Sequence, residues 1–138
     1  MRVLLDTCVI IDALQNREPF SEDAQNIFLA VANWEIEGYI TAKAITDIYY
    51  LTHRLTHSDS ATRDILNKLF SLFGVLDTTV NDCREAVFSG VADYEDAVMI
   101  MTAEREKMDY IVTRNIRDYS KSKIPVLTPA ELINKIAE

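Results

Sequence analysis

The most constraining feature of the sequence is a short apolar run near its N-terminus that ends in a carboxylate. Val3, Leu4 and Leu5 stand together and are followed directly by Asp6. An apolar run of this length predicts a strand buried on both faces, as in a parallel sheet covered by helices. Asp6 then lies at the carboxyl end of that strand, where open α/β sheets bind their ligands.

Asp6 requires a partner in this position. An ionised carboxylate beside so much apolar surface costs free energy unless a cation, a hydrogen-bond donor or a helix terminus stabilises it. One interpretation is that Asp6 caps a helix beginning near Cys8, because aspartate is among the best capping residues. The other is that Asp6 binds a metal ion, and this interpretation requires further carboxylates at equivalent places.

The remaining sequence alternates short apolar segments with amphipathic ones. Helical periodicity and capping residues predict helices over 21–31, 42–55, 61–73, 81–89 and 93–108, with Gly74 as the residue that ends the third. Strands are expected over 38–41, 75–77, 109–113 and 124–127, the last at a sheet edge because of Pro125. A capping box at 128–131 predicts a final helix. This alternation favours a parallel α/β sandwich.

Length and composition limit the class of protein. The 138 residues suit a single domain, which we expect to span 1–138. No apolar stretch is long enough to cross a membrane, and Asp6 and Asp12 interrupt the only candidate for a secretory signal, so we expect a cytoplasmic protein. The two cysteines, Cys8 and Cys83, lack zinc-ligand spacing and are expected to be reduced.

The charge of the chain is uneven. Acidic residues outnumber basic ones by 22 to 14, and a net charge of −8 argues against non-specific binding to nucleic acid. Residues 114–123 reverse this balance, with Asp118 as their only acid. A solvated loop explains such a run, as does a surface that holds a phosphate chain. The basic residues of the run are Arg114, Arg117, Lys121 and Lys123.

Several carboxylates follow the predicted strands and are expected at one edge of the sheet. They are Asp6, Asp47, Asp93, Asp96 and Asp118. Each has a purely structural explanation when taken alone: Asp47 can pair with Lys43, for example, and Asp93 can cap a helix. Three or four carboxylates that share a cleft repel one another unless a divalent cation is present.

Oxygen ligands without a histidine or cysteine cluster indicate a hard cation, Mg²⁺ or Mn²⁺. An ion bound by a few carboxylates keeps positions open for water and phosphate oxygens. This combination is typical of phosphodiester hydrolysis, because the ion lowers the pKa of an attacking water.

Three segments of the sequence resemble the PIN-domain ribonucleases, and most closely the VapC-like toxins of bacterial toxin–antitoxin systems. The segments are 3–12, with Asp6 at its centre, 93–97, which contains Asp96, and 110–119, which reads Tyr-Ile-Val-Thr-Arg-Asn-Ile-Arg-Asp-Tyr. The similarity covers nearly the whole chain. It implies a three-layer sandwich with a central, mostly parallel sheet of five strands, an acidic metal site and endonucleolytic cleavage of RNA.

The resemblance also implies a role for individual residues. Asp6 and Asp96 match metal ligands, and Asp118 matches a third, with Asn115 as a neighbouring candidate. Asp47 falls where the family commonly has glutamate, so its match is less complete. The remaining candidates are residues that flank the site and orient a carboxylate, a water or the substrate. They are Thr7, Thr113, Arg114, Asn115 and Arg117.

The leading hypothesis from the sequence is an endoribonuclease that depends on Mg²⁺ or Mn²⁺, with Asp6, Asp47, Asp96 and Asp118 as catalytic residues. The resemblance adds an antitoxin protein and a second copy of the chain as expected partners. The alternative is a PIN-like module that binds RNA or protein and has weak or no catalytic activity. The replacement of the usual glutamate by Asp47 is the feature that keeps this alternative open.

Overall fold

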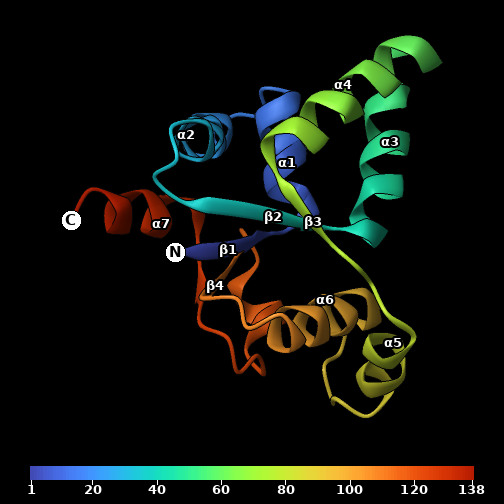
Figure 1. Cartoon of the computed structure of the whole chain (residues 1–138), viewed down its shortest axis with the longest axis vertical. Coiled ribbons are helices and arrows are strands. Elements are labelled where there is room, and N and C mark those ends of the chain that lie inside the picture. The colour runs from blue at the N-terminus through green and yellow to red at the C-terminus, as the bar shows by residue number, and fades with distance from the viewer.

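The computed structural model describes residues 1–138, and these form one parallel sheet covered by helices on both faces (Figure 1). The sheet has five strands in the order β3-β2-β1-β4-β5, and all four pairs are parallel. This confirms the predicted α/β sandwich. The strands are β1 (Arg2–Leu5), β2 (Glu37–Thr41), β3 (Gly74–Leu76), β4 (Tyr110–Val112) and β5 (Val126–Leu127).

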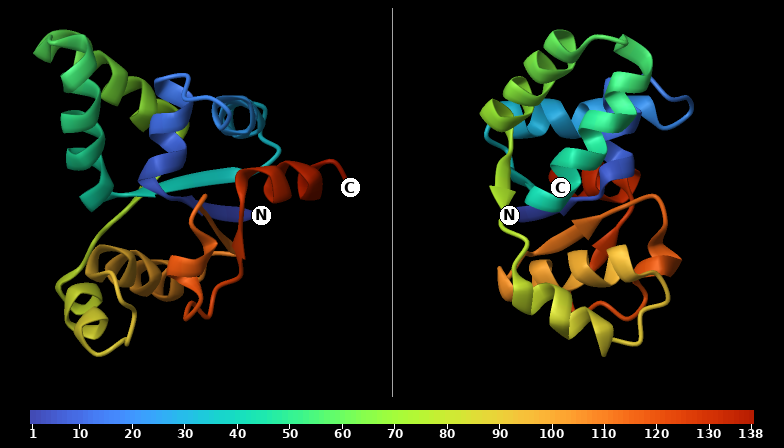
Figure 2. Two further views of the ribbon diagram at one scale, coloured as in Figure 1. Left: turned by 180° about the vertical axis from the view of Figure 1, so that it is seen from behind. Right: turned by 90° about the vertical axis from the view of Figure 1, so that its right-hand side faces the viewer.

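The helices form two layers on opposite faces of the sheet. They are α1 (Thr7–Leu14), α2 (Ser21–Ala32), α3 (Ala42–Thr56), α4 (Asp59–Leu72), α5 (Val80–Val87), α6 (Tyr94–Arg105) and α7 (Pro129–Ile136), with a short 3₁₀ helix, η1 (Ile116–Tyr119). Figures 1 and 2 show α1 to α4 on one face and α5 with α6 on the other. The pair α3 and α4 extends away from the sheet.

The central strand β1 is buried on both faces, as the apolar run predicts. Val3 and Leu5 pack into the larger core with α1, α2 and α3, whereas Leu4 packs on the other face with Ile100 of α6 and Ile111 of β4. All three β1 side chains have no exposed surface. Because β1 is fixed by packing on both faces and by strands on both sides, the residue that follows it, Asp6, has a well-defined position.

Several helices begin where the sequence predicts, each at a residue whose side chain caps the helix. The Thr41 hydroxyl accepts a hydrogen bond from the Ala44 amide at 3.2 Å, and the Asp93 carboxylate accepts one from the Asp96 amide at 3.0 Å. The capping box of Thr128 and Glu131 is formed. Each cap satisfies an amide that has no partner inside its helix.

Several predicted boundaries are wrong, including those of α5, which ends at Val87, and of β5, which starts at Val126. Helix α4 begins at Asp59, because the Ser58 hydroxyl caps it, and α6 ends at Arg105. Gly74 is not a left-handed helix terminus: α4 ends in extended backbone at Phe73, and Gly74 is the first residue of β3. A Cβ at Gly74 would lie 2.5 Å from the Tyr39 ring, so only glycine lets the backbone of β3 approach this ring so closely.

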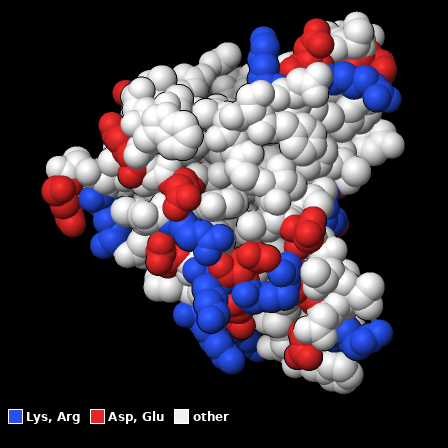
Figure 3. All heavy atoms as spheres, viewed as in Figure 1, with Lys and Arg blue, Asp and Glu red and all other residues white.

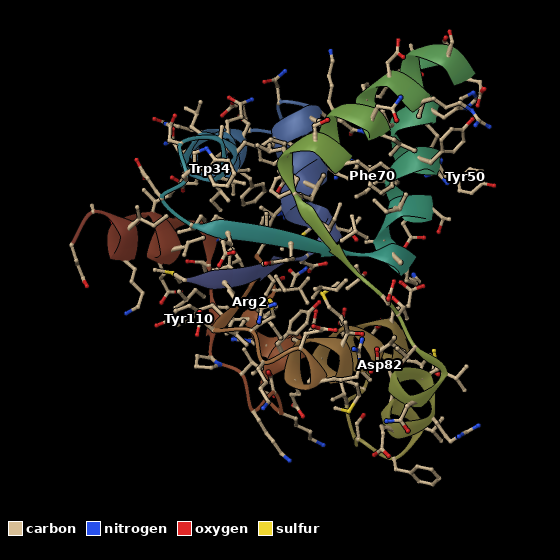
Figure 4. The ribbon with its side chains drawn as sticks, in the orientation of Figure 1. Arg2, Trp34, Tyr50, Phe70, Asp82 and Tyr110 are labelled. Atoms are coloured by element: carbon tan, nitrogen blue, oxygen red, sulfur yellow. The ribbon has the colours of Figure 1, made fainter.

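A buried ion pair joins the two helices beneath the sheet. Asp82 of α5, 2% exposed, accepts hydrogen bonds from the Thr102 hydroxyl at 2.8 Å and from the Arg105 Nε at 2.9 Å (Figure 4). These contacts satisfy the buried carboxylate and fix α5 against α6.

The surface divides into a face with few charges and a charged region. Figure 3 shows few charged side chains in the middle of this face, near the end of α4 and β3, whereas charges lie at the outer end of α4 and acids and bases are mixed in the part where α6 lies. Trp34 and Phe70, labelled in Figure 4, are 90% and 51% exposed. None of the helices is both long and apolar enough to span a membrane.

We predict that Gly38→Ala destabilises the fold by about 1–3 kcal/mol, because the added Cβ would lie 2.7 Å from Val31 and 2.9 Å from Phe73 in a packed core. Urea denaturation measures the change. The exposed substitution Asn67→Ala serves as the control and should stay within about 0.5 kcal/mol of the wild type. A Gly38→Ala variant as stable as this control would contradict the packing described here.

Candidate functional site

A cleft opens at the carboxyl edge of the sheet, bounded by the starts of α1, α3 and α6. Its charged lining residues are Asp6, Lys43, Asp47, Arg54, Glu95 and Asp96, and Thr7 is among the hydroxyl-bearing residues that line it with them. Parallel strands bring these residues together although they are far apart in the sequence. The structure thus places three of the four predicted catalytic carboxylates in one cavity.

Asp6 is held by hydroxyl and thiol donors and not by a helix cap. The Thr113 hydroxyl donates a hydrogen bond to Asp6 Oδ2 at 2.7 Å, and the Cys8 thiol lies 3.5 Å from the same oxygen. Asp6 precedes α1, but its side chain makes no capping hydrogen bond. The structural explanation for Asp6 as a side-chain N-cap is therefore wrong, and the Thr113 hydroxyl lies where it could orient Asp6 as the sequence suggests.

The thiol of Cys8 stays neutral in this environment. Burial raises the pKa of Cys8 to about 11, and the charge of Asp6 acts in the same direction. Neither cysteine forms a disulfide. The predicted reduced state is consistent with this arrangement.

Asp96, in the first turn of α6, faces the same cleft and is held by a buried tyrosine. The hydroxyl of Tyr119, which is 1% exposed, donates to Asp96 Oδ1 at 3.1 Å. Burial raises the pKa of Asp96 to about 6, and the charges of Asp93, Asp6 and Asp118 add to the shift. The hydrogen bond from Tyr119 opposes the shift without cancelling it. Asp96 is thus partly buried, lies among like charges and has no cationic partner in the chain.

Asp47 is paired with a lysine inside the cleft. Lys43 Nζ lies 2.6 Å from Asp47 Oδ2 and 3.2 Å from Glu95 Oε2. The pairing with Lys43 is the structural alternative considered for Asp47 above, and the structure forms it. Glu95 is a further acid of the cleft that sequence reasoning did not single out.

Asp118 lies outside the cleft, in a neighbouring hollow. It is exposed on η1 and lines this hollow together with Asn115 and Arg117. Asp118 is near enough to raise the pKa of Asp96, although its effect is the smallest of the three acids that do so. Asp118 and Asn115 thus line a different hollow from Asp6 and Asp96.

Arg114 has a structural role that the sequence interpretation missed. Its Nε donates to Asp12 Oδ2 at 2.6 Å, and its guanidinium lies 4.0 Å from the centre of the Phe20 ring. Asp12 is 1% exposed, so removal of either partner would leave a charge without compensation. Arg114 thus anchors the segment after β4 to α1, while it also lines the hollow that contains the exposed Arg117, and its contact with a phosphate stays a prediction.

A comparison with protein families decides where the chain belongs. Residues 2–117 match the family model described as the PIN domain. The chain belongs to the PIN domain family. No curated protein matches the sequence.

Solved structures share this PIN-domain fold over most of their length. DNA-bound VapBC from Salmonella typhimurium has a TM-score of 0.70 at 17% identity, covering 94% of this chain and 98% of that one. A toxin–antitoxin complex from Klebsiella pneumoniae has a TM-score of 0.66 at 23% identity, covering 92% and 97%. VapC20 from Mycobacterium tuberculosis, described as a sarcin-ricin loop cleaving toxin, has a TM-score of 0.63 at 11% identity, covering 79% and 86%.

The chemistry of the PIN-domain cleft fits a hard cation that keeps much of its water. No three histidine, cysteine, aspartate or glutamate side chains lie close enough to form a complete ligand set. The cleft instead offers the carboxylates of Asp6 and Asp96, and Mg²⁺ is commonly bound through one or two carboxylates with water in its other positions. Oxygen donors alone exclude a typical zinc site.

Sequence reasoning missed Tyr119, Glu95 and the role of Asp12. Tyr119 directly follows Asp118, but no sequence pattern shows that η1 turns its ring under α6 toward Asp96. Glu95 adjoins Asp96 and was available as a candidate, since both lie in the first turn of α6.

We predict that Asp96→Asn raises the melting temperature of the metal-free protein by about 3 °C at pH 7.5. The folded-state pKa of about 6 exceeds the ordinary value of 3.8, so ionisation of Asp96 costs stability. That cost is present above pH 6 and disappears as the pH falls through 6 toward 4. Melting curves across this range test the prediction, with the exposed Asp64→Asn as control; equal melting temperatures for Asp96→Asn and wild type at pH 7.5 would refute it.

Proposed function

We propose that this PIN-domain chain is a metal-dependent endoribonuclease that hydrolyses RNA phosphodiester bonds and serves as the toxin of a toxin–antitoxin pair. The observation that carries the proposal is the pair Asp6 and Asp96, which reach one cleft from β1 and α6. Membership of the PIN domain family supports a nuclease, and the structural similarity to VapC20, described as a cleaving toxin, supports RNA as the substrate.

Two hydroxyl groups prepare the carboxylates for this role. Thr113 donates a hydrogen bond to one oxygen of Asp6, and Tyr119 donates one to one oxygen of Asp96. The other oxygen of each carboxylate makes no hydrogen bond within the chain. The two free oxygens are the atoms we assign to hold Mg²⁺ or Mn²⁺. When bound, the ion would stabilise negative charge on a phosphoryl oxygen and lower the pKa of a water that attacks phosphorus.

Other residues of the site are assigned to water and substrate. Thr7 lines the cleft beside Asp6 and is placed to bind a water or a phosphate oxygen. Asn115 and Arg117, both exposed in the adjoining hollow, are assigned to the RNA backbone beyond the cleft. Asp118, in the same hollow, is assigned to the ion through water, because it influences Asp96 without lining the cleft.

The proposal includes two protein partners. The similar structures include one described as a toxin–antitoxin complex, which supports an antitoxin as a partner of this chain. The weakly charged face with exposed Trp34 and Phe70 supports a protein contact, and we assign it to a second copy of the chain or to the antitoxin.

One observation favours the alternative, a PIN-like module that binds RNA or protein and cuts weakly or not at all. Asp47, which falls where the family commonly has glutamate, is bound to Lys43 in this structure. A module of this kind would bind RNA but show no Mn²⁺ binding that depends on Asp96. Equilibrium dialysis with Mn²⁺ therefore separates the two proposals.

We predict that the purified protein cleaves a mixed pool of structured RNAs with Mn²⁺, and that Asp6→Asn lowers the rate at least about 100-fold, the upper range reported for groups that support a metal site. EDTA should stop cleavage in the same way. Cleavage that survives in Asp6→Asn would contradict the assigned site. Absence of cleavage combined with Mn²⁺ binding would direct the search to a narrower substrate.

We predict that Thr113→Val lowers cleavage and Mn²⁺ affinity by about 10- to 100-fold, because Asp6 Oδ2 loses its 2.7 Å donor. Thr113→Ser keeps the hydroxyl and serves as the matched control, with activity close to that of the wild type. Isothermal titration and cleavage rates measure both effects. A Thr113→Val variant with unchanged Mn²⁺ affinity would show that Thr113 does not orient the site.

A further inference from the structure

Lys43 places a positive charge among the acids of the cleft. It lies in the first turn of α3, where its amide hydrogen-bonds the Thr78 hydroxyl at 3.3 Å. Its Nζ lies 2.6 Å from Asp47 on its own helix and 3.2 Å from Glu95 on α6. The ammonium therefore joins α3 to α6, which lie on opposite faces of the sheet (Figure 1).

The acids of the cleft consequently fall into two pairs with different partners. Asp6 and Asp96 accept hydrogen bonds from neutral hydroxyls, which do not cancel their charge. Asp47 and Glu95 share the ammonium of Lys43. A bound cation is usually the largest charge in a site of this kind. Here the side chain of Lys43 supplies a positive charge to Asp47 and Glu95.

The ammonium remains charged under ordinary conditions. Burial lowers the pKa of Lys43, but its contacts with Asp47 and Glu95 outweigh burial, and the pKa lies above its usual value. No other ion pair joins α3 to α6. Loss of Lys43 would therefore leave Asp47 and Glu95 without an ion-pair partner beside Asp6 and Asp96, although Arg54 also lines the cleft.

We propose that Lys43 acts as a built-in counter-cation which offsets one of the two negative charges of the Asp47–Glu95 pair and restricts the cleft to one divalent ion, held at Asp6 and Asp96. The inference rests on the proposed metal-dependent function and specifies it further. Lys43 is a positioning residue in this account: it sets the number of ions that the cleft accepts and keeps Asp47 from serving as a direct ligand.

The ion pairs are exposed enough that their removal leaves the fold intact. The side chains of Lys43, Asp47 and Glu95 are 40%, 39% and 71% exposed. Ion pairs with this exposure contribute little to stability. Substitutions at Lys43 therefore test metal binding without unfolding the chain, and circular dichroism of each variant checks this.

The test is the stoichiometry of Mn²⁺ binding to the full chain, measured by isothermal titration calorimetry and by electron paramagnetic resonance of free Mn²⁺. We expect about one ion per chain for the wild type and about two for Lys43→Met. Lys68→Met, which removes an exposed lysine of α4, is the matched control and should bind as the wild type does. Glu95→Gln added to Lys43→Met should restore a stoichiometry of about one.

Each remaining outcome contradicts a definite part of the account. One ion in both the wild type and Lys43→Met, with equal affinity, would overturn the role of Lys43 and leave the proposed function standing. Two ions in the wild type would do the same. No Mn²⁺ binding in either protein would overturn both the role of Lys43 and the proposed function.

Discussion

The site depends on the bonds that two hydroxyl groups make to two carboxylates. In the parallel pairing of β1 with β4, Leu5 lies opposite Val112, so the next residues, Asp6 and Thr113, meet at the edge of the sheet. Their 2.7 Å hydrogen bond follows from this register. Tyr119 provides the second bond from beneath α6. A strand buried on both faces cannot slide without exposing its apolar side chains, and the position of Asp6 is as fixed as the core itself.

The fully buried carboxylates and the half-buried one have different kinds of hydrogen-bond partner. Asp12 and Asp82 are almost fully buried, and each is compensated by an arginine, Arg114 and Arg105 respectively. Asp96 is half-buried and receives only a neutral hydroxyl, so its pKa rises to about 6. These two structural carboxylates are thus paired with cations of the chain, whereas Asp6 and Asp96 accept hydrogen bonds from neutral hydroxyls, as the proposed metal site requires. This contrast is the strongest physical support for a metal centre.

The fold could be predicted from the sequence because its signals are local. Apolar runs marked the buried strands, and Thr41, Asp93 and Thr128 marked helix starts by capping. Gly74 was misread because glycine serves both helix ends and close packing, and only the Tyr39 ring opposite it decides between them. The candidate site was predicted where acids follow strands. Tyr119, the Lys43–Glu95 contact and the Arg114–Asp12 pair depend on tertiary packing, which no spacing in the sequence encodes.

The most direct measurement is anomalous diffraction from crystals of the protein grown with Mn²⁺, collected near the manganese absorption edge. The account predicts an anomalous peak between the Asp6 and Asp96 carboxylates, with Thr113 and Tyr119 still bonded to them. A peak elsewhere, or a cleft in which Mn²⁺ contacts neither carboxylate, would contradict the assignment of this edge of the sheet as a metal centre.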